Sequence, residues 1–529
     1  MQIYLCCPSS AEHLSEILFL AFSRSFTKGQ LKKVTETELI DVFDQEEKIA
    51  MVVANPTEKL AEMIVKCLDR RGNKILILGR IPELTANYLR IKISRIPEYV
   101  KTATLCENAE IYNFSTSPAQ IVYQNNPLLD IQSPIIRRAC IRYDFMDEWN
   151  NLGYGAVRSD ETIWALTQFV EGCSENVIAT LDIEGKPDSL YAAFWLNDSS
   201  SLLWYNRSVG PIDTQEWRLV EKYFTSFGFP DSPCFPAVSE VPRGFDASVT
   251  MRLDCDEDIS SANHLFDLYR DLDVPLSLAL HSSLLQNANH ASFVRDVVES
   301  GGSILTHSAT HPSDWGGEYN EAKNQVLLSR SEILTAIGKH VRIDYAVSPF
   351  HQNPPYAISA MSDAGLYGFV GGIVKNDPEY LFARAGQVPY GPEGFISHSQ
   401  QCMLHGDCMI EGDDPLCEYK KSFEISKKGR ALFGYLDHPF SERYQYGWQS
   451  EIQRLRAHKD FIAHIKNSGS VKFFSENNAL DWLRQKSLIL IRPGNNGSFK
   501  IEVPGEIEDF RDYVVEFAGT QIPLNTFVI

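Results

Sequence analysis

Two runs of alternating apolar strands and amphipathic helices, one on each side of a proline-rich stretch, most constrain the fold of this chain. The proline-rich stretch lies between Phe229 and Gly244, and proline and turn residues of this kind interrupt regular structure. A second alternation begins at Ala247 and continues to about Ser487. Because 529 residues exceed what one ordinary core holds, we predict an α/β protein divided at 1–240, 241–487 and 488–529, with the last part a short β-rich appendage.

The first half is predicted to be an α/β domain built on a parallel sheet. Ile3–Cys7, Ile49–Ala54 and Lys74–Leu78 are apolar enough to be buried strands, and Glu58–Arg71 repeats apolar residues at helical spacing. The later part is predicted to be rich in strands: Val177–Ile183, Leu190–Leu196 and Leu202–Tyr205, followed by a helix over Trp217–Phe227. The rhythm loosely resembles flavodoxin-like or glutamine-amidotransferase-like folds. Since it contains no glycine-rich phosphate loop and no nucleophile elbow, its function stays open.

Charge and cysteine content disfavour several partners and compartments. The formal net charge of −20 argues against nucleic acid or an anionic membrane surface as a partner. No segment is long and apolar enough for a membrane-spanning helix, and the first residues lack the basic region of a secretory signal. Eleven cysteines without a recognisable framework are typical of reduced thiols. We therefore expect a cytoplasmic protein.

The strongest chemical signal begins with an apolar strand that ends in carboxylates. In the run Val249–Asp258, alternate side chains of a strand share one face, so Arg252, Asp254 and Asp256 lie together. Active sites of parallel barrels lie at this carboxyl end of the strands. The alternative is that the acids cap a helix that starts near Ser260, which explains one carboxylate but not two.

Two histidines follow about fifty residues later. His307 and His311 are four residues apart, so they converge if the segment turns helically, and Pro312 fits the start of a following helix. Two imidazoles and a carboxylate suit a catalytic first-row metal such as zinc. A pair of histidines at this spacing is usually coincidental by itself. The preceding strand with Asp254 and Asp256 strengthens the interpretation as a metal site.

Residues 247 to about 485 resemble the polysaccharide deacetylase family, also called the NodB-homology family or carbohydrate esterase family 4. The acid pair Asp254-Cys255-Asp256 and the sequence from His307 to His311 match its first two motifs. The resemblance implies a distorted (β/α) barrel in which Asp254 is the general base. It also implies that Asp256, His307 and His311 hold Zn²⁺ or another divalent first-row ion.

The family's last motif supplies a histidine as general acid, and Phe433–Pro439 fits it with His438 in that place. A histidine with a purely structural hydrogen bond is the alternative for this position. Tyr446 and Trp448 are candidates for lining a sugar-binding groove, because aromatic faces stack on pyranose rings. They are equally compatible with a place in the core.

One departure from the family concerns its third motif, which supplies an arginine that orients the catalytic aspartate. The corresponding stretch, Tyr345–His351, contains no arginine. Arg252, on the same strand face as Asp254, is the first candidate to replace it, and His351 is a weaker one. His351 is also a candidate for substrate binding.

Three cysteines and a histidine in the second half form another pattern. Cys402, His405 and Cys408 are spaced by three residues, and Cys417 follows nine residues after Cys408. The residue types suit a structural zinc site, but free buried cysteines are the more common case. His405 and Asp407 are alternatively candidates for bordering the substrate pocket.

Taken together, the residues predict a metal-dependent hydrolase that removes acetyl groups from an N-acetylated sugar or a glycan precursor. A hydrolase of another C–N bond, such as a cyclic amide or ureide, is the first alternative, because the acid pair separated by one residue also resembles that branch. A binding protein of a glycan pathway that has lost turnover is the second. The partner is a carbohydrate or a small amide, and the sequence leaves the oligomeric state open.

Overall fold

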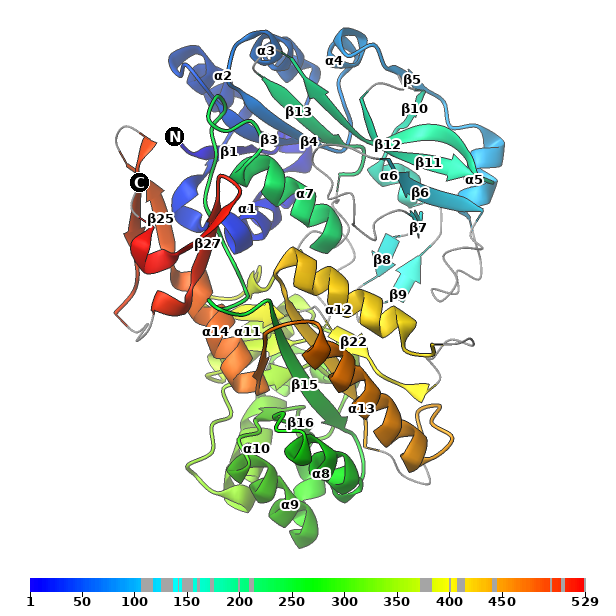
Figure 1. Ribbon diagram of the computed structural model, residues 1–529, viewed down its shortest axis with the longest axis vertical. Helices are drawn as coiled ribbons and strands as arrows, with labels where there is room; N and C mark the ends of the chain where they lie inside the picture. Colours follow the sequence, from blue (N-terminus) through cyan, green and yellow to red (C-terminus); the bar gives the residue numbers. More distant parts are fainter. Residues whose placement is uncertain are drawn as a thin grey trace.

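The structure is a computed structural model (Figure 1). It describes residues 1–105, 118–124, 137–140, 142–144, 156–158, 162–171, 176–197, 200–208, 214–371, 383–398, 401–406, 414–439, 445–494, 497–505 and 510–527.

A mixed sheet forms the centre of the first half. Its strand order, among the described residues, is β2-β1-β3-β4-β13-β12-β11-β6-β7. In that order the strands span Leu31–Val34, Ile3–Cys6, Ala50–Ala54, Lys74–Leu78, Ser201–Tyr205, Lys186–Leu196, Val177–Ile183, Ala119–Tyr123 and Arg137–Ala139. Neighbours are parallel from β2 to β13 and antiparallel from β13 to β7. The prediction of a parallel sheet therefore describes only the first part, whose order is that of flavodoxin-like sheets.

Helices cover both faces of this sheet. Ala50 and Val52 of β3 enter one hydrophobic cluster, whereas Met51 and Val53 enter another. A strand buried on both faces is uniformly apolar, which is why β3 and β4 could be recognised from sequence. The helices of this half are α1 (His13–Phe26), α2 (Glu36–Gln45), α3 (Glu58–Asp69), α4 (Glu83–Tyr88), α5 (Glu98–Thr104), α6 (Ile163–Leu166) and α7 (Thr214–Thr225). Two small two-stranded sheets pair β5 (Lys92–Ser94) with β10 (Phe169–Glu171) and β8 (Arg142–Asp144) with β9 (Ala156–Arg158).

The second half contains a parallel sheet that curls into a distorted barrel. Its described strands follow the order β20-β21-β19-β18-β17-β16-β15-β23-β22, and β24 also pairs with β15. They span Gly386–Gln387, Ile396–His398, Gly368–Val370, Tyr345–Val347, Ile304–Thr306, Ser277–Leu280, Ala247–Cys255, Leu432–Asp437, Gln401–Met403 and, for β24, Val471–Phe474. Only β20 and β21 are antiparallel within this described sheet. Because β21 and β22 are consecutive in the chain but lie towards opposite ends of the order, the sheet must curl.

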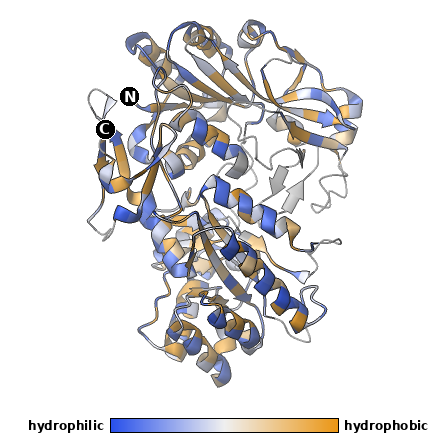
Figure 2. Cartoon of the chain, viewed as in Figure 1, coloured by the Kyte–Doolittle hydropathy of each residue, from blue (hydrophilic) through white to orange (hydrophobic). Residues whose placement is uncertain are grey.

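Helices surround this barrel on the outside, and Figure 2 shows largely orange strands with blue stretches on the helices around them. They are α8 (Asn263–Asp271), α9 (Ala288–Glu299), α10 (Tyr319–Ile337), α11 (Pro355–Asp363), α12 (Cys417–Gly429), α13 (Glu451–Asn467) and α14 (Glu476–Leu488). The C-terminal part forms two hairpins, β25 (Leu490–Pro493) with β26 (Phe499–Glu502) and β27 (Val514–Phe517) with β28 (Thr520–Pro523). A strand of the connecting stretch, β14 (Ala237–Val238), pairs with β27. The division at 240 and 487 stays a prediction.

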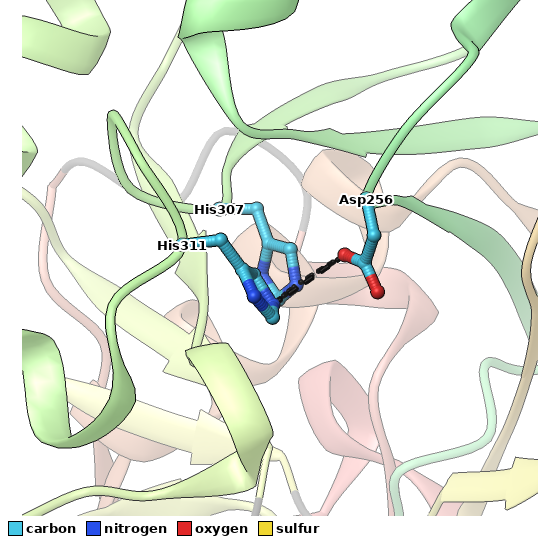
Figure 3. A group of neighbouring side chains, drawn as sticks. All are labelled: Asp256, His307 and His311. Carbon is cyan, nitrogen blue, oxygen red and sulfur yellow. Dashed lines mark hydrogen bonds and ion pairs between the residues drawn. The ribbon is translucent and has the colours of Figure 1, made fainter.

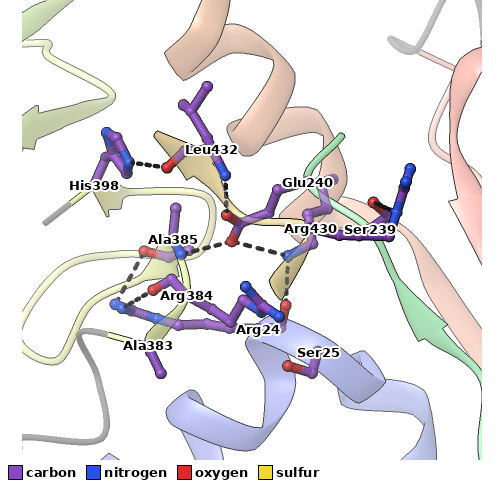
Figure 4. Close-up of polar contacts among 12 residues, drawn as sticks. Arg24, Ser25, Ser239, Glu240, Ala383, Arg384, Ala385, His398, Arg430 and Leu432 are labelled. Atoms are coloured by element: carbon purple, nitrogen blue, oxygen red, sulfur yellow. Dashed lines mark hydrogen bonds and ion pairs between the residues drawn. The ribbon is translucent and has the colours of Figure 1, made fainter. Parts of the chain in front are cut away.

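A buried network of charged side chains joins the first half to the barrel (Figure 4). Arg24 of α1 donates hydrogen bonds to the carbonyl oxygens of Arg384 and Gln387, both at 2.7 Å. The Arg384 guanidinium in turn pairs with Glu221 of α7 at 2.6 Å. Buried charges of this kind persist only when they are paired and hydrogen-bonded.

Glu240, in the stretch that connects the halves, is the centre of this network. It is 1% exposed and accepts hydrogen bonds from the backbone N–H groups of Ala385 (2.8 Å) and Leu432 (2.9 Å). Lys486 of α14 lies 3.4 Å from the same carboxylate. Leu432 is the first residue of β23, so the network lies at the amino end of that strand.

No described helix is long and apolar enough to cross a membrane. In the described part of the chain, Cys6, Cys7, Cys67, Cys140, Cys234 and Cys255 are free thiols.

Candidate metal centre and active site

Strand β15 brings the first two predicted residues together inside the barrel. The Arg252 Nε donates to Asp254 Oδ1 at 2.7 Å, and its Nη2 donates to Oδ2 at 3.1 Å. Burial raises the pKa of Asp254, but the adjacent guanidinium more than offsets this and leaves the pKa at about 2. Asp254 is therefore ionised and fixed in orientation. Arg252 makes this contact, whereas His351 forms no hydrogen bond to Asp254.

Asp256, His307 and His311 converge on one point at the carboxyl ends of β15 and β17 (Figure 3). The Nε2 atoms of the two imidazoles are 3.0 Å apart, and each lies 3.4 Å from Asp256 Oδ1. That carboxylate oxygen is buried and accepts no hydrogen bond from the described chain.

The segment that carries the two histidines is a loop and not the helical turn that their spacing predicts. Ser308 has a φ of 68° and His311 a φ of 55°, so two residues in the left-handed region turn the chain back. Pro312 precedes a short 3-10 helix, Ser313–Gly316, and the α-helix starts only at Tyr319. Left-handed backbone is uncommon outside glycine and tends to cluster at functional sites.

Hydrogen bonding fixes how His307 faces this point. Its Nδ1 lies 2.9 Å from the carbonyl oxygen of Val347, which can only accept, so Nδ1 carries a proton and Nε2 is the nitrogen that faces Asp256 and His311. Burial and the neighbouring His307 lower the pKa of His311 to about 4. A neutral imidazole is the protonation state that a metal ligand requires.

The three side chains fit a tetrahedral divalent ion. Zinc bonds of about 2.0–2.1 Å place neighbouring ligand atoms about 3.3 Å apart. The observed separations of 3.0 and 3.4 Å bracket that value. A buried carboxylate oxygen without a donor is also costly unless a cation satisfies it.

His438 follows strand β23 and faces the same point from the other side. Its Nε2 lies 3.5 Å from Asp256 Oδ2, and its Nδ1 lies 2.8 Å from His405 Nε2. The Tyr446 ring stacks on the His438 ring, with centroids 4.2 Å apart and an interplanar angle of 14°. His438 therefore has a fixed orientation and a histidine partner on its inner nitrogen.

His405, Asp437 and His438 also lie close enough together to hold a metal ion. However, Asp437 is fully buried and already accepts hydrogen bonds from Arg454 Nε at 2.7 Å and from His458 Nε2 at 2.9 Å. Because its charge is satisfied by these donors, we assign this second group to support of His438.

The two aromatic residues predicted to line a groove, and the cysteines that are candidates for a zinc site, have different positions in the structure. Tyr446 lines the pocket, whereas Trp448 is 1% exposed and donates to Asp437 at 3.4 Å, so it belongs to the core. In the described chain, Cys402 and Cys417 belong to no cluster of ligand atoms. Cys408 and Asp407 lie outside the described residues.

These side chains surround a pocket of about 320 Å³. It is lined by Asp254, Asp256, His307, His311, Ser348, Phe350, His351, Met403, His405, His438 and Tyr446. Sequence reasoning missed Ser348, Phe350 and Met403. Ser348 directly follows β18 and Met403 ends β22, so a position at the carboxyl end of a barrel strand is the signal that could have found them.

Comparison with known proteins finds similar solved structures but no family by sequence. No protein-family model matches the chain. No curated protein matches it either. A family 4 carbohydrate esterase from Streptomyces lividans, solved in complex with acetate, shares 12% identity over 42% of this chain and 91% of its own, with a TM-score of 0.29.

Two further solved structures are each similar over 46% of the chain. Puue allantoinase has 14% identity, covering 46% of this chain and 92% of its own, with a TM-score of 0.35. A family 4 carbohydrate esterase pseudoenzyme from Bacillus anthracis has 13% identity, covering 46% and 68%, with a TM-score of 0.30. Since these TM-scores are below 0.5, the fold and site described above rest on the strands and side chains of this chain alone.

Proposed function

We propose that this protein is a metal-dependent amide hydrolase that removes the acetyl group from an N-acetylated sugar or glycan precursor. The observation that carries the proposal is the convergence of Asp256, His307 and His311 beside the ionised Asp254. Their ligand atoms have the separations of a tetrahedral site, and one of them is a buried oxygen without a hydrogen-bond donor.

In this proposal Asp256, His307 and His311 hold a zinc or similar ion. When bound, such an ion supplies Lewis acidity, which lowers the pKa of a water molecule and polarises an acyl carbonyl. Asp254 then accepts the proton of the attacking water. Arg252 keeps that carboxylate ionised and aimed through the contacts at 2.7 and 3.1 Å.

His438 is the group that protonates the departing amine. When His405 Nε2 donates to His438 Nδ1, the remaining N–H of His438 is directed from Nε2 towards the pocket and Asp256. Arg454 fixes the position of these residues, because it donates hydrogen bonds to both the Asp437 carboxylate and the His438 carbonyl oxygen, each at 2.7 Å. Water adds to the acyl carbon, the C–N bond breaks, and acetate and a free amine result.

Hydrolysis of a cyclic amide or ureide is the second candidate, favoured by the one-residue spacing of Asp254 and Asp256. The two are separated by incubating the zinc-loaded protein with N-acetylglucosamine or its short oligomers and, in parallel, with a hydantoin. Acetate release that is lost in His307→Ala supports the deacetylase. Ring opening without acetate release supports the second candidate, with the same metal ligands and base. If neither compound is hydrolysed, the hydrolase proposal is refuted.

Replacement of Arg252 should shift the pH dependence of the reaction. Arg252→Gln removes the guanidinium that lowers the pKa of Asp254, so that pKa should rise by about 1–3 units. Because Asp254 works in its ionised form, the acid limb of kcat/KM against pH should move upward by the same amount. Arg270→Gln, which breaks an exposed ion pair to Asp267, serves as the control and should leave the limb in place. An acid limb at the same pH in Arg252→Gln and wild type would mean that another group is the base.

A further inference from the structure

His351 differs from the other histidines that line the pocket. His307, His311, His405 and His438 each have a hydrogen bond or an ion pair. The His351 imidazole also lines the pocket, but it makes neither with any described residue. An imidazole carries one donor and one acceptor when neutral, so this ring presents unused hydrogen-bonding capacity to whatever occupies the pocket.

The backbone holds His351 in an unfavourable conformation. Phe350 and His351 follow each other with φ values of 52° and 57°, in the left-handed region that side chains rarely adopt. The loop is fixed by hydrogen bonds from the His351 N–H to the Ser348 carbonyl oxygen (3.0 Å) and from Asn353 Nδ2 to the His351 carbonyl oxygen (3.1 Å). Ser348 and Asn353 also bond to each other through their side chains. Strain of this kind persists where the surroundings over-determine it, which is typical of ligand-contacting segments.

The charge of the surroundings defines what the ring can bind. Burial lowers the pKa of His351 to about 3, so the ring is neutral at physiological pH. Among the described lining residues there is no lysine and no arginine. The described lining residues therefore provide no basic side chain that could pair with a carboxylate or phosphate substituent next to His351. A hydroxyl group, which both donates and accepts, matches the neutral imidazole.

We infer that His351 is a specificity residue that hydrogen-bonds a hydroxyl group of the substrate next to the scissile amide. The inference deepens the proposed hydrolase function, on which it rests, by defining the substrate as a hydroxylated N-acyl amine. Asp254, the proposed base for the attacking water, lines the same pocket as His351, so a hydroxyl group next to the scissile amide falls within the same pocket as the reaction.

The test compares two small probes that differ in one group, 2-acetamidocyclohexanol and N-cyclohexylacetamide. Their binding to the zinc-loaded Asp254→Asn variant, which should turn the ligand over far more slowly than the wild type, is measured by NMR titration. One neutral hydrogen bond predicts that the hydroxylated probe binds about 3- to 10-fold more tightly. In the same protein with His351→Leu the ratio should fall to about 1.

Phe350→Leu is the matched control, because it alters the adjacent apolar wall and should weaken both probes without changing their ratio. A ratio of about 1 before the His351 change, or a preference that survives His351→Leu, overturns the inference. Acetate release by the wild type is measured separately. If the ratio behaves as expected while no acetate appears, hydroxyl recognition stands and the proposed hydrolysis fails.

Discussion

Asp254→Asn should lower kcat by about 10²–10⁴-fold, the usual contribution of a general base, while the bound metal is retained. The substitution keeps the shape of the side chain but removes its ability to accept a proton. Metal content should not change because Asp254 is not among the three converging ligands. The measurement is acetate release by the zinc-loaded variant, with metal determined on the same sample.

The control for this variant is Asp258→Asn. Asp258 lies a few residues further along the chain, beyond the end of β15, is half-exposed, and contacts His290 instead of the pocket. Its replacement should leave kcat within a few-fold of wild type. If Asp254→Asn keeps more than a tenth of the wild-type rate with its metal bound, the base must be sought elsewhere in the pocket.

Glu240→Ala should destabilise the protein by about 3–5 kcal/mol, because removing one partner of a buried ionic network leaves the others uncompensated. The substitution removes the carboxylate that accepts hydrogen bonds from the backbone N–H groups of Ala385 and Leu432 and that pairs with Lys486. Burial raises the pKa of Glu240, but Lys486 and Arg384 more than offset this, so its pKa lies below the ordinary 4.5. The stabilisation is therefore complete above about pH 4.5 and is lost as the pH falls through the lowered value.

The loss is measured by urea unfolding of Glu240→Ala and of Glu16→Ala. Glu16 forms an exposed ion pair with Lys33 at 2.6 Å, and its removal should cost less than about 1 kcal/mol. Similar losses in the two variants would show that the network does not couple the first half to the barrel. The network contacts β23 at its first residue, whereas His438 follows its last, and the residues that line the pocket all lie between 254 and 446. Through Glu240, the network therefore contacts β23 at the end opposite to His438.

Sequence patterns were sufficient to predict the features that depend on a single strand or helix. The alternation of β15 places Arg252, Asp254 and Asp256 on one face, and the continuous apolar runs of β3 and β4 correspond to strands buried on both faces. The helix over Glu58–Asp69 follows from its apolar spacing in the same way. These features depend only on the period of the backbone.

Features that depend on distant partners could not be read from the sequence. His307 and His311 meet through left-handed residues in a loop, which their spacing does not encode. His405 reaches His438 because β22 pairs with β23, a contact between separate segments. The antiparallel strands that extend the first sheet depend on long-range pairing as well. Tyr446 and Trp448 are two residues apart, and only the tertiary structure distinguishes the pocket residue from the core residue.

The metal centre is tested by elemental analysis of the purified protein beside Asp256→Ala and His307→Ala. We predict one equivalent of zinc or a similar divalent ion in the wild type and its loss in both variants, whose circular dichroism spectra should show that they remain folded. A wild type that stays metal-free after exposure to zinc, or variants that retain the ion, would contradict the metal centre and with it the proposed hydrolase.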